Sequence, residues 1–179
     1  MRPENSVDFS NIKAFAFDVD GVFTDGSVFC DLHGELFRTF NAKDGFAVRM
    51  AVMNGYKVGI ITGGRSGSVK ARFLTLGLKT EDIYLGSRNK IEDLTDFCSR
   101  HGLALSEIMY VGDDIPDIQV IERSGIGICP ADAVEEVKQV SDYISVFPGG
   151  KGCVRDTIET VLKSQGRWVY DALEYKKRF

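Results

Sequence analysis

Two aspartates, Asp18 and Asp20, follow an apolar run at residues 14–17 and stand directly before Gly21. Alternate residues of an extended chain point the same way, so both carboxylates would project from one side of a strand end. Carboxylates this close repel each other unless a cation lies between them or one holds a proton. The pair indicates a metal site or acid–base chemistry, with an acidic turn after a core strand as the structural alternative.

A second polar site, with the sequence TGGRS, follows the apolar run 58–61 and leads into a predicted helix. The hydroxyl of Thr62, the amides of Gly63 and Gly64 and a helix N-terminus together form the kind of cradle that binds phosphate. The structural alternative is a glycine turn in which Ser66 caps the helix, and the two interpretations are compatible.

Further charged residues follow two other apolar runs. Lys90 stands near the start of a predicted helix, where a cation opposes the helix dipole unless an anion is bound nearby. Asp113, Asp114 and Asp117 follow the run 108–111, and acidic residues also stabilise helix starts without any ligand. Three carboxylates in this short stretch, beside a second acidic strand end, favour a functional site.

Short apolar runs alternate with helical patterns along the chain, which predicts parallel strands joined by right-handed crossovers. The fold expected is a three-layer, doubly wound α/β sheet, Rossmann-like, with helices on both faces. In such sheets ligands bind at the carboxyl ends of the strands, where every site above falls. A β-hairpin at 24–41, turning at 31–34, interrupts the pattern after the first strand. The strands are predicted at 14–17, 58–61, 83–85, 108–111, 126–129 and 143–146, and the helices at 45–54, 66–76, 90–101, 115–124, 133–140 and 152–164.

Composition is that of one ordinary domain spanning 1–179, with 44% hydrophobic residues and a net charge of −4. The absence of a basic region argues against nucleic-acid binding, and no apolar run is long enough to span a membrane. The four cysteines are scattered without CxxC spacing, which predicts reduced thiols and a cytoplasmic protein.

Taken together, these side chains fit phosphoryl transfer. Carboxylates without histidine or cysteine partners favour Mg²⁺ over zinc, and a cation, a lysine and amide donors together neutralise a phosphoryl group. One carboxylate can attack phosphorus as a nucleophile, and a second can protonate the leaving oxygen and then activate water.

The ordered motifs resemble those of the haloacid dehalogenase superfamily of phosphatases. The resemblance implies that Asp18 is the nucleophile and Asp20 the general acid and base, while Thr62 and Lys90 hold the phosphoryl group. Mg²⁺ would be bound by Asp18, by the backbone carbonyl of Asp20 and by Asp113. Asp114 and Asp117 would support the metal site or orient Lys90.

Longer stretches are similar to the cap-less phosphatases of this superfamily that act on 3-deoxy-D-manno-octulosonate 8-phosphate: residues 18–26, 40–45, 62–66 and 148–155. This resemblance implies an anionic sugar-acid substrate, no cap domain, and a homotetramer assembled through the hairpins, with a neighbour closing each site. Gly64 and Arg65 are then candidate substrate contacts, and Arg155 a further one, although both arginines are equally compatible with surface ion pairs. The tail 167–179 reads as an amphipathic helix that packs on its own core or on a neighbour.

Three alternatives differ in function. A phosphatase for a nonulosonate 9-phosphate would share every catalytic side chain. A non-catalytic oligomerisation module of the same fold has little reason to keep Asp18, Asp20, Lys90 and Asp113 intact. A phospho-receiver domain carries its third aspartate before the threonine and lysine, whereas Asp113 follows both here.

Overall fold

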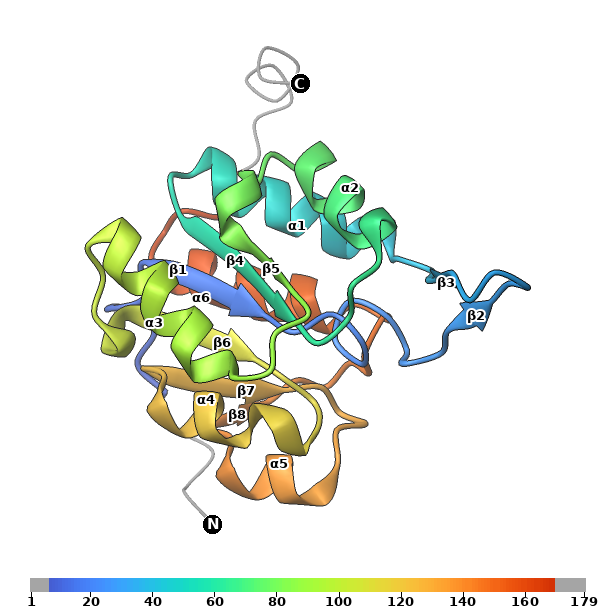
Figure 1. Cartoon of the computed structure of the whole chain (residues 1–179). Coiled ribbons are helices and arrows are strands. Elements are labelled where there is room, and N and C mark those ends of the chain that lie inside the picture. The colour runs from blue at the N-terminus through green and yellow to red at the C-terminus, as the bar shows by residue number, and fades with distance from the viewer. Residues whose placement is uncertain (1–6, 170–179) are drawn as a thin grey trace.

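The computed structural model describes residues 7–169, which form a parallel six-stranded sheet between two layers of helices (Figure 1). The strands are β1 (Ala14–Phe17), β4 (Lys57–Thr62), β5 (Ile83–Leu85), β6 (Ile108–Val111), β7 (Ile126–Cys129) and β8 (Tyr143–Ile144). Their order is β5-β4-β1-β6-β7-β8, so the sheet extends from β1 in one direction through β4 and β5 and in the other through β6, β7 and β8. The predicted doubly wound α/β fold is confirmed.

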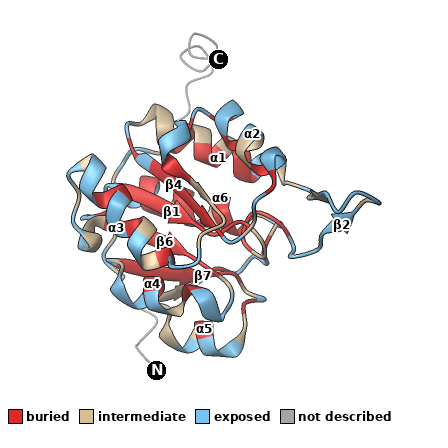
Figure 2. Ribbon diagram, in the orientation of Figure 1, coloured by how far each residue is buried: buried red, intermediate tan, exposed pale blue. Residues whose placement is uncertain are grey.

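The side chains of β1 alternate between the two faces of the sheet, as its pleat requires. Phe15 and Phe17 enter one core with helices α1 (Ala42–Met53), α2 (Gly67–Thr75) and α6 (Cys153–Ser164). Ala14 and Ala16 enter the other core with α3 (Lys90–His101), α4 (Ile118–Arg123) and α5 (Glu135–Val140). Because both faces are covered, all of β1 is buried, and the sheet forms the buried centre in Figure 2.

A two-stranded hairpin, β2 (Phe29–Cys30) with β3 (Leu36–Phe37), extends from the body of the molecule after β1 (Figure 1). It pairs antiparallel, as the sequence predicted, and most of it is exposed (Figure 2). Phe40, just after β3, packs edge-on against Phe73 of α2 and anchors this end of the hairpin to the body. Within residues 7–169 the hairpin is the sole excursion from the sheet-and-helix pattern, as expected of a cap-less fold.

Several predicted element ends were wrong. Helix α1 begins at Ala42 rather than 45, because the Asn41 side chain accepts a hydrogen bond from the Lys43 amide and caps the helix there. The predicted helix 115–124 opens with a 3-10 turn at Ile115–Asp117, which contains a proline. Helix α5 begins at 135 rather than 133, and β8 ends at 144 rather than 146.

The tail prediction is tested only over its first three residues. Residues 167–169 are not helical, although Trp168 packs against the core as expected, and 170–179 lie outside the described residues. None of the helices described is long and apolar enough to cross a membrane.

Candidate active site

Asp18 is the first residue after β1, one of the two central strands, and lies at the carboxyl end of the sheet. Its backbone amide donates to the Val111 carbonyl at the end of β6, which continues the ladder one residue beyond the strand. The residue is 7% exposed, although it carries a carboxylate. Such a group needs a partner in a buried position.

Lys90 provides that partner. Its ammonium lies 3.1 Å from Asp18 Oδ2 and 2.7 Å from Asp117 Oδ1, and all three side chains are at least nine-tenths buried. Asp117 also accepts a 2.6 Å hydrogen bond from the hydroxyl of Tyr110, a buried residue of β6. The lysine at the start of α3 is therefore fixed between two carboxylates from other elements.

Two glycines let the carboxylates approach one another. Gly21 has φ +84°, and a Cβ there would lie 1.9 Å from Asp113 Oδ2. A Cβ on Gly112 would lie 2.4 Å from the carboxyl carbon of Asp117. Any side chain at either position would displace a carboxylate, so glycine is required by space at both and by conformation at Gly21.

The donor set fits a hard divalent cation. Carboxylate oxygens of Asp18, Asp113 and Asp117 lie within 4.8 Å of one another. Asp113 Oδ1 is buried and has no hydrogen-bond partner among the described residues, so an acceptor is available. Asp117 is already occupied, because Oδ1 accepts from Lys90 and Tyr110 while Oδ2 accepts from the amides of Asp113 and Asp114. Within this cluster Asp113 thus has a free buried acceptor, whereas both oxygens of Asp117 are engaged and one of them holds Lys90.

The clustered charges shift several ionisation equilibria. Burial raises the pKa of Asp18 to about 6, and repulsion from Asp117 adds to the rise. Burial, followed by repulsion from Asp18 and Asp117, raises the pKa of Asp113 to about 7. For Lys90, burial favours the neutral amine, but attraction to the two aspartates outweighs it and raises the lysine pKa. The site is thus an anion-rich cluster that favours a proton or a cation.

Thr62 ends β4 beside this cluster and is 2% exposed. Its hydroxyl oxygen accepts a hydrogen bond from the Gly64 amide at 3.2 Å, which leaves its own hydrogen to donate. The Gly64 amide is therefore engaged within the turn. Ser66 stands at the N-cap of α2 as predicted, but its hydroxyl bonds the Ser68 hydroxyl at 2.7 Å and makes no capping bond.

Asp20 is positioned by a residue that the sequence reasoning missed. Arg38, one residue after β3, donates from Nε to Asp20 Oδ1 at 2.5 Å and from Nη2 to Oδ2 at 2.9 Å. Arg38 lies 18 residues from Asp20, in a hairpin interpreted only as an assembly element. The one feature of the sequence that could have indicated this role is the presence of a basic residue near the base of the hairpin.

Other predicted residues have visible local partners. Asp114 is exposed, and its side chain accepts from the Ile115 amide, so it caps the 3-10 turn. Arg65 is exposed and its side chain lies against Gly86. Arg155 pairs with Glu159 at 3.1 Å and stacks on the rings of Phe46 and Trp168, the arrangement expected of a structural arginine.

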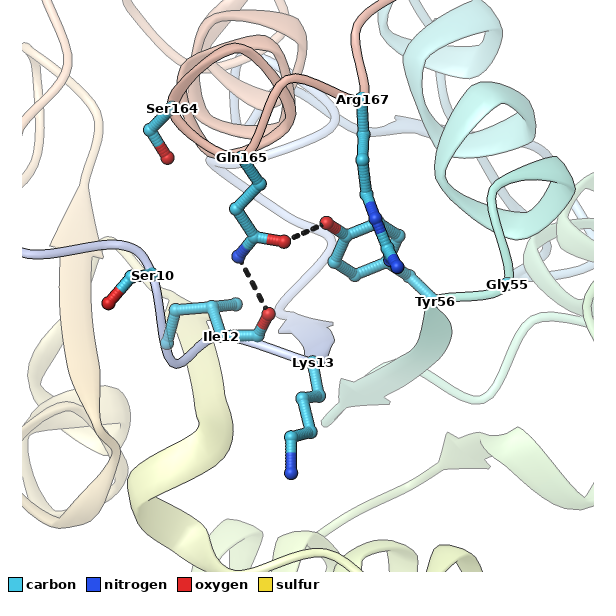
Figure 3. A pocket seen from close by; sticks show the side chains of 8 residues that line it. All are labelled: Ser10, Ile12, Lys13, Gly55, Tyr56, Ser164, Gln165 and Arg167. Carbon is cyan, nitrogen blue, oxygen red and sulfur yellow. Dashed lines mark hydrogen bonds between the residues drawn. The ribbon is translucent and has the colours of Figure 1, made fainter.

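A separate pocket of about 580 Å³ lies at the opposite edge of the sheet (Figure 3). Its lining includes Ile12 and Tyr56, which precede β1 and β4, so it faces away from the carboxyl ends. Gln165 donates to the Ile12 carbonyl at 2.9 Å and accepts from the Tyr56 hydroxyl (Figure 3). These bonds tie the end of α6 to the sheet, and the pocket is not part of the carboxylate cluster.

Comparison with known proteins places this geometry in a family. A model of haloacid dehalogenase-like hydrolases matches residues 67–149. The 3-deoxy-D-manno-octulosonate 8-phosphate phosphatase of Salmonella typhimurium is 35% identical over 167 residues, covering 93% of this chain and 88% of the relative.

Solved structures agree with this assignment. The Moraxella catarrhalis 3-deoxy-D-manno-octulosonate 8-phosphate phosphatase, in complex with magnesium, phosphate and KDO, has a TM-score of 0.85 and 34% identity, with coverage of 89% of this chain and 91% of that one. The cobalt-bound deoxy-D-mannose-octulosonate 8-phosphate phosphatase of Haemophilus influenzae has a TM-score of 0.87 and 31% identity, with coverage of 93% and 96%.

The resemblance inferred from the motifs is confirmed, and with it the prediction of an enzyme. The chain belongs to the haloacid dehalogenase-like hydrolases, in the family of the 3-deoxy-D-manno-octulosonate 8-phosphate phosphatases.

Proposed function

We propose that this protein is a Mg²⁺-dependent phosphatase that hydrolyses 3-deoxy-D-manno-octulosonate 8-phosphate to the free sugar acid and phosphate, in the synthesis of lipopolysaccharide precursors. The observation that carries the proposal is the buried Asp18, 3.1 Å from Lys90, in a chain that is 35% identical to such a phosphatase over nearly its whole length. The whole chain acts as one domain.

Asp18 is the nucleophile. One of its carboxylate oxygens attacks phosphorus, the bond between phosphorus and the sugar oxygen breaks, and an aspartyl-phosphate forms. Lys90 lies against the same carboxylate and is charged, so it offsets negative charge on the transferring phosphoryl oxygens. The hydroxyl of Thr62 and the amide of Gly63 donate hydrogen bonds to those oxygens.

Asp20 moves the protons. It gives a proton to the leaving sugar oxygen, and as a carboxylate it then takes one from the water that attacks the aspartyl-phosphate. Cleavage of the bond between phosphorus and the Asp18 oxygen releases inorganic phosphate and restores the free carboxylate. The two aspartates therefore have separate functions, which matches their separate partners, Lys90 and Arg38.

Asp18, Asp113 and the backbone carbonyl of Asp20 would hold Mg²⁺, supported by the unpartnered Asp113 Oδ1 and by the relative that contains magnesium. The bound ion neutralises charge on the phosphoryl group and on the attacking carboxylate. Asp117, and Asp114 through the turn that it caps, keep Lys90 and Asp113 in place.

The exposed hairpin supports assembly into a homotetramer in which a neighbour closes each site. Val28, Phe29, Leu32 and Phe37 are between 48% and 102% exposed, and apolar exposure of this kind marks contact surfaces. Gly64 and Arg65 contact the substrate, and the exposed Arg65 is available to the carboxylate of an anionic sugar acid. All four cysteines are free thiols, which supports a reducing, cytoplasmic location.

A rate comparison on two substrates tests the proposal. Purified protein with Mg²⁺ is assayed on octulosonate 8-phosphate and on a nonulosonate 9-phosphate under identical conditions. We expect a higher kcat/KM on the octulosonate. A clear preference for the nonulosonate would overturn the substrate assignment, and a lack of turnover on both would overturn the phosphatase itself.

A further inference from the structure

The Arg38 guanidinium donates two hydrogen bonds to the Asp20 carboxylate. The two bonds, 2.5 Å from Nε and 2.9 Å from Nη2, reach different oxygens, and Nη1 donates to the Leu36 carbonyl at 3.2 Å. The Arg38 side chain is 2% exposed, whereas that of Asp20 is 34% exposed. Arg38 is the one hydrogen-bond partner of this carboxylate among residues 7–169.

The backbone beside Arg38 is anchored on its C-terminal side. Phe40 packs on Phe73 with ring centroids 5.9 Å apart. Asn41 caps α1 and donates from its side chain to the Gly150 carbonyl at 3.3 Å. The hairpin therefore extends freely beyond Arg38, while the residues that follow Arg38 belong to the body of the molecule.

Gly64 leaves the space that the guanidinium occupies. A Cβ on Gly64 would lie 3.2 Å from Arg38 Nη2 and 3.7 Å from Asp20 Oδ2. This residue lies in the turn after β4 that carries Thr62, so Arg38 and Asp20 are packed against the predicted phosphate site.

We propose that Arg38 is a positioning residue that orients Asp20 for proton transfer, an inference that rests on the proposed function of Asp20. Each carboxylate oxygen has two lone-pair directions, and the bidentate contact uses one of each oxygen. Arg38 thereby fixes the plane of the carboxylate and leaves one direction on each oxygen for the leaving group or the water. A lysine cannot reproduce this, because it binds as a point charge.

If Arg38 orients Asp20, its loss should affect substrates differently according to their leaving groups. A sugar alkoxide is a poor leaving group and depends on a well-placed proton donor, whereas p-nitrophenolate leaves without one. A misplaced Asp20 should therefore slow the first step, transfer of the phosphoryl group to Asp18, on the sugar phosphate and spare that step on p-nitrophenyl phosphate. The later hydrolysis of the aspartyl-phosphate is common to both substrates, so the first turnover is what distinguishes them. A general loss of folding would slow both alike.

The experiment compares Arg38→Met and Arg38→Lys with Arg123→Gln, which removes an exposed arginine on α4 away from the site. For Arg38→Met we expect the first-turnover rate on octulosonate 8-phosphate, at saturating substrate, to fall by about 10²-fold, within the range that general acid–base catalysis supplies. On p-nitrophenyl phosphate we expect a change within about threefold, since proton donation matters little there. Arg38→Lys should fall between wild type and Arg38→Met, and Arg123→Gln should match wild type on both substrates.

Equal losses of the first-turnover rate on the two substrates would overturn the inference. So would weaker saturation by the sugar-acid phosphate at an unchanged first-turnover rate, because that result identifies Arg38 as a substrate contact instead. If Arg38→Met does not fold, the ratio of the two losses in Arg38→Lys decides in the same way. The wild-type rates test the proposed function separately, since Arg38 is judged from each variant relative to wild type on the same substrate.

Discussion

The hydroxyl of Tyr110 donates a 2.6 Å hydrogen bond to Oδ1 of Asp117, the oxygen that also accepts from Lys90. Tyr110 is fully buried in β6, and burial followed by the negative charge of Asp117 raises its pKa, so it stays a donor. Asp117 is thus fixed on one oxygen by a tyrosine and on the other by two backbone amides. The lysine that faces the nucleophile depends on this arrangement.

Replacing Tyr110 by phenylalanine should loosen that support. Loss of one buried hydrogen bond lowers the free energy of unfolding by about 1 kcal/mol, and kcat should fall several-fold as Lys90 shifts. Thermal unfolding and steady-state kinetics measure the two effects. Tyr143→Phe is the matched control, because its hydroxyl bonds Asp156, which is not part of the carboxylate cluster, so kcat should be unchanged. Equal kcat in the two variants would contradict a role for Tyr110 in the site.

Asp18→Asn should abolish turnover while the protein stays folded. An amide is a poor nucleophile for phosphorus, so we expect kcat to fall by more than about 10³-fold. The same change removes a buried negative charge next to Asp117, so the metal-free variant should unfold at a temperature no lower than wild type. Phosphate release and circular dichroism check the two expectations. Retained turnover in a folded variant would rule out Asp18 as the nucleophile.

Stabilisation by Mg²⁺ should increase with pH. The pKa values of Asp18 and Asp113 rise from 3.8 to about 6 and about 7 in the folded, metal-free protein. Folding thus favours their protonated forms, and this contribution to stability is complete below about pH 3.8 and is lost as the pH rises through those values. Mg²⁺ binds the ionised carboxylates, so it must displace protons at low pH.

The measurement is the shift in melting temperature caused by Mg²⁺ at about pH 5 and about pH 8, with the larger shift expected at the higher pH. Asp113→Asn is the control, since it removes one ligand and should reduce the shift at both pH values. A Mg²⁺ shift of the same size at both pH values in wild type would contradict the assignment of these ligands.

The hairpin should carry self-association. Phe29 is 71% exposed, so Phe29→Asp should place a charge in the contact and lower the sedimentation coefficient toward that of the monomer. Leu74→Asp tests an exposed apolar residue on α2 and should leave association unchanged. A wild-type protein that remains monomeric at all concentrations would exclude the tetramer.

Much of the fold was predictable because its signals are local. Apolar runs such as 108–111 gave the strands, and the strand–helix alternation gave the parallel sheet, which in turn placed Asp18, Thr62, Lys90 and Asp113 at one edge. The start of α1 was missed although its capping residue, Asn41, stands in the sequence. Local patterns were sufficient to place the residues that directly follow a strand at the carboxyl edge of the sheet.

The partners of these residues were not predictable in the same way. Tyr110 reads as one more apolar strand residue, and Arg38 reads as part of a solvent-exposed hairpin. Tyr110 and Arg38 act by donating hydrogen bonds to carboxylate oxygens of Asp117 and Asp20. No periodicity or spacing in the sequence indicates which carboxylate a side chain reaches in the folded protein. The sequence indicated the reacting groups, and the structure was needed to identify the side chains that hold them.

The separation of these groups along the chain has a consequence for refolding. Asp18, Lys90 and Asp117 come together only when β1 has paired with both β4 and β6, and each of these pairings closes a long loop. Helices form within microseconds, whereas non-local parallel pairing is slow. After dilution from denaturant, the helical signal should therefore recover before enzymatic activity, and the recovery of activity should follow the slower of these two pairings.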